Sequence, residues 1–289
     1  MKSLPARGGA TLRSASLPGL RAAALDALRV DAPREKAARA RALFQGDIAA
    51  TAADRPSAPL LPPDTPGRPA RPPLVDPREL ARRNVTTIEG RCVMLHAIAH
   101  IEFNAINLAL DAVARFDGMP VDFYRDWIRV AAEEGYHFTL LADRLEDLGS
   151  AYGAYPAHDG LWEMALRTKD DVLARMALVP RTLEARGLDA APPIRAKLSA
   201  AGDSIAAGII DIILRDEIGH VAIGNRWYRW LCAREGRDPL AHYAVLARDY
   251  RAPRLRGPFN LAARRAAGFD EAELAALQAP APLRTEGSA

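Results

Sequence analysis

The sequence is poor in the residues that build disulfide frameworks or thiolate metal sites. It has two cysteines, Cys92 and Cys232, among 289 residues, and neither belongs to a Cys-x-x-Cys pair. Both lie in segments of helical periodicity, so neither a set of disulfides nor an iron site with four thiolates can be built. The scarcity of cysteine favours a reducing compartment.

Long apolar runs and strand-like alternation are also scarce. The basic N-terminal segment has no apolar core and no signal-cleavage pattern, and no later window approaches the roughly 20 uncharged apolar residues of a membrane span. No apolar pattern with a period of two persists, and no hairpin dipeptide separates apolar runs. We therefore expect an all-α cytoplasmic protein that does not act at a membrane.

Charge is nearly balanced along the chain. The formal net charge is +3 and the pI is near 9.0, and the surplus comes from scattered arginines rather than from one dense run. This composition does not by itself indicate a partner such as nucleic acid. With 49% hydrophobic residues, the chain is long enough for one large core with extensions.

The pattern of helices and prolines divides the chain into three parts. Residues 1–85 combine two short helical stretches, from Leu20 and from Pro33, with a proline-rich strap between Pro56 and Pro77. Residues 86–235 carry the long amphipathic segments of a four-helix bundle, and residues 236–289 form short helical pieces and a tail. Proline fixes φ and lacks an N–H donor, so we expect the strap to run extended over the bundle or to be partly disordered.

Capping and breaking signals set the expected ends of the long helices. The Thr-x-x-Glu pattern of residues 86–89 has the form of a capping box at the start of the first helix. The second helix is expected to stop before Gly149. The third is expected to bend at Pro180 and to end at Gly187, and the fourth to begin after Asp203.

Two copies of a Glu-x-x-His signature, at residues 134–137 and 217–220, occur within these helices. Because a helix turns by about 100° per residue, a glutamate and a histidine three positions apart share one face and can bind the same metal ion. A single copy often arises by chance on a solvated face. Two copies with apolar neighbours indicate a common site.

A lone glutamate precedes each signature by almost the same interval: Glu102 lies 32 residues before Glu134, and Glu184 lies 33 residues before Glu217. Four carboxylates and two imidazoles are the ligands expected for a pair of iron or manganese ions inside a helical bundle. Zinc fits less well, because its structural sites are tetrahedral and often rich in thiolate. The predicted metal ligands are Glu102, Glu134, His137, Glu184, Glu217 and His220.

A further acid stands directly before each signature. A metal-bound imidazole usually donates its other N–H to a carboxylate or carbonyl, so we expect Asp216 to hold His137 and Glu133 to hold His220. The alternative is that both acids face water or a neighbouring arginine. For Glu184 the alternative is a surface ion pair with the nearby Arg181.

The segment YRAPRLRGPFN at residues 250–260 is rich in arginine. Arg251, Arg254 and Arg256, together with Arg181, are candidate contacts for an anionic substrate or an RNA backbone. The alternative is that these arginines bridge helix ends and carboxylates.

Several segments together resemble an uncharacterised bacterial family, a domain of unknown function within the ferritin-like di-iron carboxylate superfamily. They include HAIAHIEFNAINLALDA, AAEEGYHF, RMALVPRTLEARGLD and ILRDEIGHVAIGNRW, and the likeness runs from about residue 20 to residue 277. One departure is Gly135-Tyr136, where an arginine before the histidine would be expected. The resemblance implies a ferritin-like fold with a non-haem di-iron site and no settled substrate.

Three functions are compatible with this ligand set. The preferred one is an O2-dependent oxidase or monooxygenase that acts on an unidentified small molecule or RNA in an apolar pocket above the metals, with an unidentified electron donor. The second is iron storage or peroxide scavenging; the long extensions at both ends would hinder a cage, so we expect a monomer or small homo-oligomer. The third is a non-enzymatic RNA- or protein-binding module with a vestigial metal site.

Overall fold

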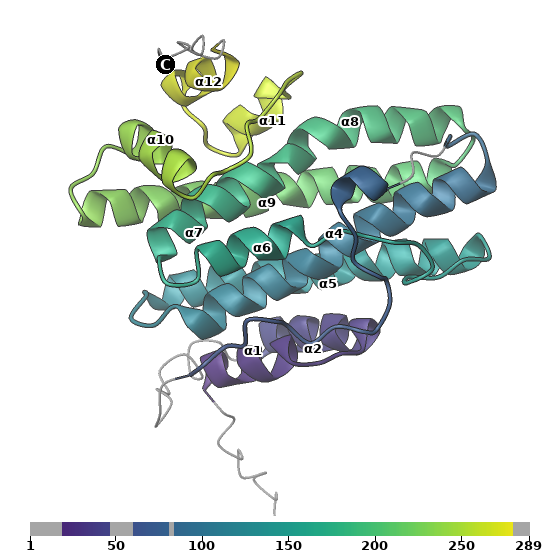
Figure 1. Cartoon of the computed structure of the whole chain (residues 1–289), viewed down its shortest axis with the longest axis horizontal. Coiled ribbons are helices and arrows are strands. Elements are labelled where there is room, and N and C mark those ends of the chain that lie inside the picture. The colour runs from purple at the N-terminus through teal and green to yellow at the C-terminus, as the bar shows by residue number, and fades with distance from the viewer. Residues whose placement is uncertain (1–18, 47–59, 81–83, 280–289) are drawn as a thin grey trace, which may run out of the picture.

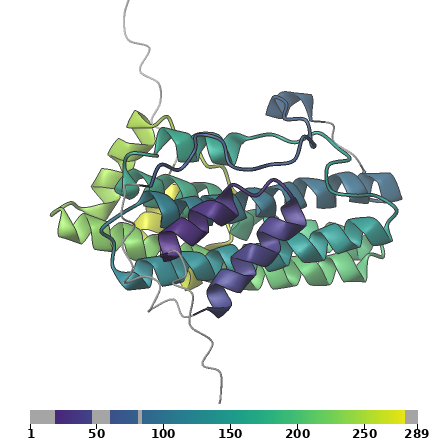
Figure 2. The same cartoon turned by 90° about the horizontal axis from the view of Figure 1, so that it is seen from below.

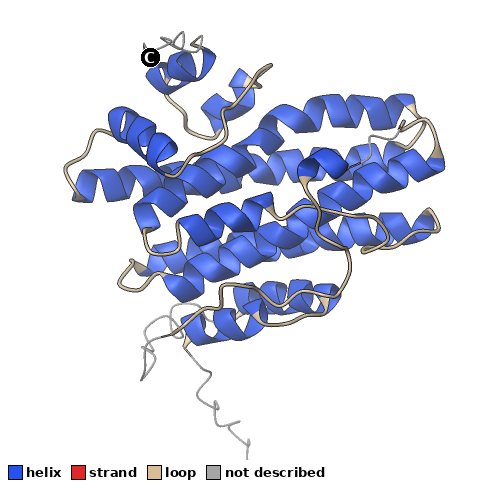
Figure 3. Ribbon diagram, in the orientation of Figure 1, coloured by secondary structure: helices blue, strands red, loops and turns tan. Residues whose placement is uncertain are grey.

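The computed structural model describes residues 19–46, 60–80 and 84–279. Within these ranges every regular element is helical, and β pairing is limited to an isolated bridge between Leu74 and Ala157 (Figure 3). The predicted all-α class is therefore confirmed for the described residues. The division into three parts stays a prediction.

Long helical rods lie side by side in the centre of the molecule (Figure 1). They are α4 (Ile88–Arg115), α5 (Val121–Asp147), α9 (Ser204–Arg234) and a composite rod made of α7 (Val172–Leu178), the π-helix η2 (Val179–Glu184) and α8 (Ala185–Ala200). Helix α5 packs against α4 and α9, and α9 packs against the composite rod. This arrangement lets α4, α5, α9 and the composite rod share one interior.

Shorter helices surround these rods. They are α1 (Leu20–Leu28), α2 (Pro33–Gln45), the 3-10 turn η1 (Pro77–Glu79), α6 (Gly160–Arg167), α10 (Pro239–Asp249), α11 (Leu261–Ala266) and α12 (Glu271–Gln278). The two N-terminal helices predicted from Leu20 and Pro33 are confirmed. Helix α6 contacts both α4 and η2.

Helices α1 and α2 lie across the outer face of α4 and α5 (Figure 2). A glycine on α5 permits this close approach, because a Cβ atom at Gly135 would lie 2.9 Å from the carbonyl oxygen of Ala37. The glycine that departs from the expected pattern therefore has a packing reason in this chain.

The proline-rich strap, as far as it is described from residue 60, runs extended over the helices as predicted. Among the hydrogen bonds that hold it, Trp162 Nε1 donates to the carbonyl of Asp64 at 2.8 Å, and the Val75 amide donates to the carbonyl of Ala157 at 2.8 Å. Residues 56–59 of the predicted strap lie outside the described residues.

The predicted helix ends are partly wrong. Thr87, not Thr86, caps α4, and its Oγ1 accepts from the Gly90 amide at 3.0 Å. The predicted end at Gly187 is also wrong, because α8 continues through two prolines to Ala200. Leu188 and Leu198 on α8 are fully buried, and this tertiary packing outweighs the local signals that would end the helix.

The composite rod changes its hydrogen-bond pattern at Pro180, which lies in the π-helix rather than in a simple bend. Proline cannot donate a backbone hydrogen bond, and the wider turn of the π-helix leaves room for its ring. The Thr182 hydroxyl donates to the carbonyl of Ala177 at 2.8 Å. The π-helix ends at Glu184, so the irregular turn places a predicted metal ligand.

Helix α4 has the length and mean hydropathy of a membrane-spanning helix, judged by length and composition alone. However, 72% of its most apolar 18-residue window is buried within the protein. It also carries Glu102. These features are those of a helix in the core of the protein.

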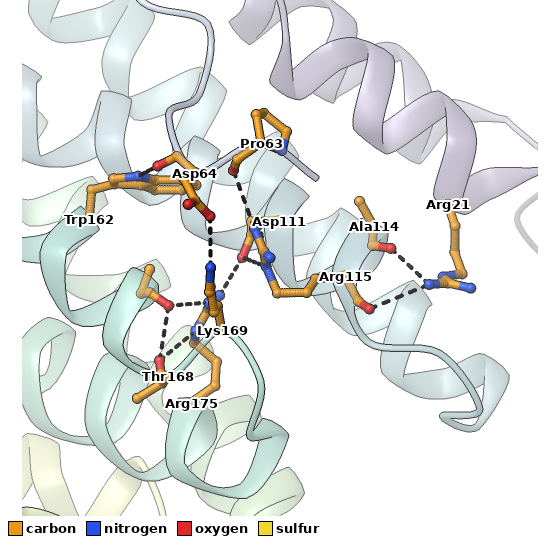
Figure 4. Close-up of polar contacts among 11 residues, drawn as sticks. Arg21, Pro63, Asp64, Asp111, Ala114, Arg115, Trp162, Thr168, Lys169 and Arg175 are labelled. Atoms are coloured by element: carbon orange, nitrogen blue, oxygen red, sulfur yellow. Dashed lines mark hydrogen bonds and ion pairs between the residues drawn. The ribbon is translucent and has the colours of Figure 1, made fainter. Parts of the chain in front are cut away.

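A buried ion-pair cluster joins α4 to α7 (Figure 4). The Asp111 carboxylate accepts from Arg175 Nη1 at 2.6 Å and from Arg115 Nη2 at 2.7 Å. Arg175 also donates to the Thr168 hydroxyl at 2.9 Å and to the carbonyl of Ala165 at 2.6 Å. Asp111 and Arg175 are almost fully buried, so the cluster fixes the start of the composite rod against α4.

Lys36 on α2 gives a testable pH dependence of stability. Its fully buried ammonium group donates to the Asn107 side chain and the carbonyl of Gly67. Burial lowers the pKa of Lys36 from 10.5 to about 7, and Asp31 and Arg68 act on it with opposite signs. Between these two pKa values the unfolded chain holds a proton that the folded chain has lost, so the free energy of unfolding gains up to about 1.4 kcal/mol per pH unit from this group as pH rises.

Replacing Lys36 with methionine is therefore expected to reduce the rise in stability between pH 7 and pH 10. Urea unfolding of the two proteins across this range measures the difference. The exposed Lys197→Met variant is the control, and it should keep the wild-type slope. If the free energy of unfolding of Lys36→Met rose with pH as steeply as that of the wild type, the lowered pKa of Lys36 would be contradicted.

Candidate metal centre

Four of the predicted ligands meet in the interior between α4, α5 and α9. Glu102, Glu134, His137 and Glu217 are buried, and each offers one ligand atom such that these atoms all lie within 4.8 Å of one another. His220 extends this group, because its Nδ1 lies 3.0 Å from Glu134 Oε1 and 3.6 Å from Glu217 Oε1. Five side chains from three helices therefore form one cluster.

Glu134 occupies the centre of the cluster. Its Oε2 lies 3.4 Å from His137 Nδ1, and its Oε1 lies 3.0 Å from His220 Nδ1. The centroids of the two imidazole rings are 5.8 Å apart. One carboxylate thus faces two histidines, each through a different oxygen.

Glu184 approaches the cluster from the last residue of the π-helix. It lies outside the group defined by the 4.8 Å limit. Its Oε2 is nevertheless buried without a hydrogen-bond partner among the described residues. Burial and the negative charges of Glu217 and Glu134 raise the pKa of Glu184 well above its usual range.

The outer nitrogen of each imidazole contacts a carboxylate of the facing helix. His137 Nε2 lies 3.1 Å from Asp216 Oδ2, and His220 Nε2 lies 2.8 Å from Glu133 Oε2. The structure contains both contacts in the pairing expected from the sequence. An Nε2–H that donates outward leaves the Nδ1 lone pair directed into the cluster.

Two surface arginines, expected from the sequence only as unnamed alternative partners of these acids, support this pairing. Arg129 Nε donates to Glu133 Oε1 at 2.9 Å, and Arg215 Nε donates to Asp216 Oδ1 at 2.8 Å. Each histidine is therefore backed by a carboxylate and then by an arginine. The spacing of Arg129 four residues before Glu133 is the signal that could have revealed the first pair.

Protons are shared unevenly within the cluster. Burial and the charge of Glu134 raise the pKa of Glu102 well above its usual range. Burial would likewise raise the pKa of Glu134, but His220 and His137 outweigh it and hold this pKa low. Burial opposes the charged forms of both imidazoles, yet their carboxylate neighbours raise the pKa values of His137 and His220. The neighbouring carboxylates thus favour the protonated, positively charged form of both imidazoles.

The unpaired atoms of the cluster have the chemistry of metal ligands. Among the described residues, both carboxylate oxygens of Glu134, Oε2 of Glu217 and Nδ1 of His220 are buried without a hydrogen-bond partner. Leaving several such atoms unpaired is costly unless a cation joins them. Carboxylate oxygen and imidazole nitrogen suit iron or manganese, so the residues present fit this kind of ion.

Arg181 is not available to an anionic substrate, contrary to the prediction. It is buried, forms an ion pair with Glu273 and donates to Asn225 Oδ1 at 2.8 Å. The alternative, a surface ion pair between Arg181 and Glu184, is also wrong, because Arg181 is buried and pairs with Glu273. The aromatic rings of Tyr228, Tyr243 and Phe269 pack around its guanidinium. Arg181 therefore joins the composite rod to the C-terminal helices.

A pocket of about 260 Å³ lies on the outer side of α4, away from the candidate ligands. Its lining includes Val93, His100 and Asn104 of α4 and His158 of the loop between α5 and α6. None of the six predicted ligands lines it. This pocket is therefore not the substrate pocket that was expected above the metals.

Gly224 on α9 controls how closely the π-helix approaches the cluster. A Cβ atom at this position would lie 2.6 Å from Pro180 Cβ. The Gly224→Ala substitution is expected to push the π-helix outward, to destabilise the fold by about 1–3 kcal/mol through overpacking, and to lower metal occupancy through Glu184. Chemical unfolding and elemental analysis after iron loading measure both effects.

The matched control is Gly208→Ala on the same helix, where an added Cβ would meet no atom within 4 Å. It should be neutral or stabilising by up to about 1 kcal/mol, because alanine favours helix more than glycine does. If both variants bound metal as the wild type does, the close contact at Pro180 would have no role in placing Glu184.

Comparison with known protein families covers nearly the same part of the chain as the resemblance described from the sequence. A family model described as "Protein of unknown function (DUF455)" matches residues 29–275. An uncharacterized protein of Haemophilus influenzae is 50% identical over 213 residues, which cover 71% of this chain and 74% of that protein. No solved structure matches the chain. The chain therefore belongs to the DUF455 family of proteins of unknown function.

Proposed function

We propose that this chain is a ferritin-like protein that holds two iron or manganese ions and acts as an O2-dependent oxidase or monooxygenase on an unidentified substrate. The observation that carries the proposal is the convergence of buried carboxylate and imidazole atoms, several of them without a hydrogen-bond partner, whose histidines are held from behind by Asp216 and Glu133. A polar cluster with a purely structural role would leave few buried atoms without such a partner.

The charges of the six ligands support a two-ion site. Four carboxylates and two neutral imidazoles carry a formal charge of −4, which two divalent cations would balance in a buried site. Glu102 Oε2 lies 3.1 Å from His137 Nδ1, and Glu217 Oε1 lies 3.6 Å from His220 Nδ1. We assign Glu134 as the shared ligand, and Glu184 as the ligand that the π-helix supplies.

The side chains of this chain orient and shield the ions. Iron or manganese, when bound, supplies redox chemistry with dioxygen that protein side chains lack. Asp216 and Glu133 fix the direction of the two imidazoles. Burial would raise the pKa values of these two acids, but their hydrogen bonds with His137 and His220, and then those with Arg215 and Arg129, lower them. The apolar core around the ligands excludes water. The scarcity of cysteine supports a cytoplasmic location, where thiols stay reduced.

The deciding experiment is metal analysis and optical spectroscopy of the purified full chain, loaded anaerobically with iron and then exposed to oxygen. About two irons per chain, with a spectral change on oxygen exposure and less peroxide released than oxygen consumed, is expected. Fewer than about one metal ion per chain after loading would favour a binding module with a vestigial site.

Two further measurements separate the proposal from iron storage. Light scattering is expected to give a monomer or small homo-oligomer, and continued iron addition is expected to saturate at the two-ion level. A very large cage that takes up many irons per chain would replace the oxidase proposal with storage.

A further inference from the structure

Residues 250–260, here called the basic loop, join α10 to α11 and carry positive charge without compensation. No acidic residue occurs between Asp249 and Asp270, whereas the same stretch contains five arginines. Arg251, Arg254 and Arg256 are exposed. Within the described part of the chain, their side chains form no ion pair or hydrogen bond.

The flanking arginines behave differently. Arg248 Nε, just before the basic loop, lies 2.8 Å from Asp249 Oδ1. Arg264, just after it, is buried and pairs with Asp189 at 2.6 Å. Arg265 pairs with Glu271 at 2.6 Å. The unpaired guanidinium groups are therefore a property of the basic loop and not of the C-terminal region as a whole.

The basic loop is anchored at both ends. The Tyr250 hydroxyl donates to Asp171 Oδ2 at 3.2 Å, and the Asn260 amide donates to Asp189 Oδ1 at 2.8 Å. Asp171 caps α7, and Asp189 lies in α8. The anchors thus place the basic loop over the composite rod, on the outside of the segment that contains the π-helix.

The backbone of the basic loop is restricted between its anchors. Pro253 and Pro258 each fix one φ angle. Arg251 has a φ of 52°, in the left-handed region that non-glycine residues rarely adopt. Strained, over-determined backbone is frequent at ligand-binding positions. The three guanidinium groups therefore project from a pre-organised frame, which lowers the entropy cost of binding.

We propose that the basic loop is a binding site for a small anion that carries several phosphate groups. Guanidinium groups donate paired hydrogen bonds that match phosphate oxygens. Three of them within six residues span at most about 18 Å of extended chain, which suits a compact oligophosphate better than a long polymer. The site does not depend on the proposed metal chemistry, because none of its arginines belongs to the metal cluster.

The test is titration calorimetry of the full chain with inorganic tripolyphosphate, with and without loaded metal. We expect binding that weakens as salt increases, and at least about tenfold weaker binding in the triple variant Arg251→Gln, Arg254→Gln, Arg256→Gln, since charge-assisted contacts are the strong ones. The control is the triple variant Arg234→Gln, Arg237→Gln, Arg248→Gln. It removes the same charge from exposed arginines that are paired with Glu235 or Asp249.

Each outcome decides the proposal. Retained binding in the control with loss in the loop variant, both with wild-type circular dichroism, supports it. Equal weakening of tripolyphosphate binding in both variants would mean that net charge alone accounts for the binding, and it would overturn the proposal. Absence of tripolyphosphate binding by the wild type, or equal affinity for single phosphate, would also overturn it. Tight binding of a single-stranded oligonucleotide alone would replace it with a nucleic-acid surface.

Discussion

Glu134→Gln is expected to abolish stoichiometric binding of two metal ions. Glu134 faces both histidines, through a different oxygen in each case, so one substitution removes charge from both proposed ion positions. An amide offers one neutral oxygen in place of a charged pair, and hard cations such as iron(II) and manganese(II) bind it far more weakly. Elemental analysis after anaerobic iron loading and desalting measures the loss.

The control for this variant is Glu146→Gln, on the exposed face of the same helix. It should retain the full metal content and the spectral change on oxygen exposure. Circular dichroism and urea unfolding in the presence of a chelator establish that both variants fold. A folded Glu134→Gln protein that still held two ions per chain would remove Glu134 from the proposed ligands and with it the shared position between the histidines.

Much of the cluster could be predicted because its information is local. Residues three apart on a helix share a face, so His137 and His220 were assigned together with their glutamates from spacing alone. The acids beside the signatures followed from the need of an imidazole N–H for an acceptor. The first inference uses helix geometry alone, whereas the second also uses the expected helical bundle, because Asp216 lies 79 residues from His137.

The composite rod was harder to predict because tertiary packing decides its form. Gly187 and the two following prolines have the local chemistry of a helix end, but the burial of Leu188 and Leu198 carries α8 through them. Spacing also gave no indication that Arg181 would find its acid at Glu273, 92 residues away. Partners at such distances depend on how the helices are arranged.

Asp111 is the clearest example of such a long-range partner, and its replacement is expected to change the free energy of unfolding more than any other substitution considered. Arg175 lies 64 residues from Asp111, is 1% exposed and donates to its Oδ2 at 2.6 Å (Figure 4). Burial lowers the pKa of Arg175, and the Asp111 charge opposes this change. Asp111→Ala is expected to reduce the free energy of unfolding by about 3–5 kcal/mol, because it leaves a buried guanidinium without its counter-charge.

A double variant separates the loss of an attraction from the cost of an unpaired charge. Replacing Asp111 with leucine and Arg175 with methionine together is expected to be much less harmful than Asp111→Ala alone, because no buried ion remains between α4 and α7. Asp143→Ala, which breaks the exposed pair with Arg34, should cost less than about 1 kcal/mol. Urea unfolding of the four proteins gives the comparison. A small effect of Asp111→Ala, equal to that of Asp143→Ala, would mean that Arg175 reaches water or another acceptor, and that the composite rod is held against α4 by apolar packing alone.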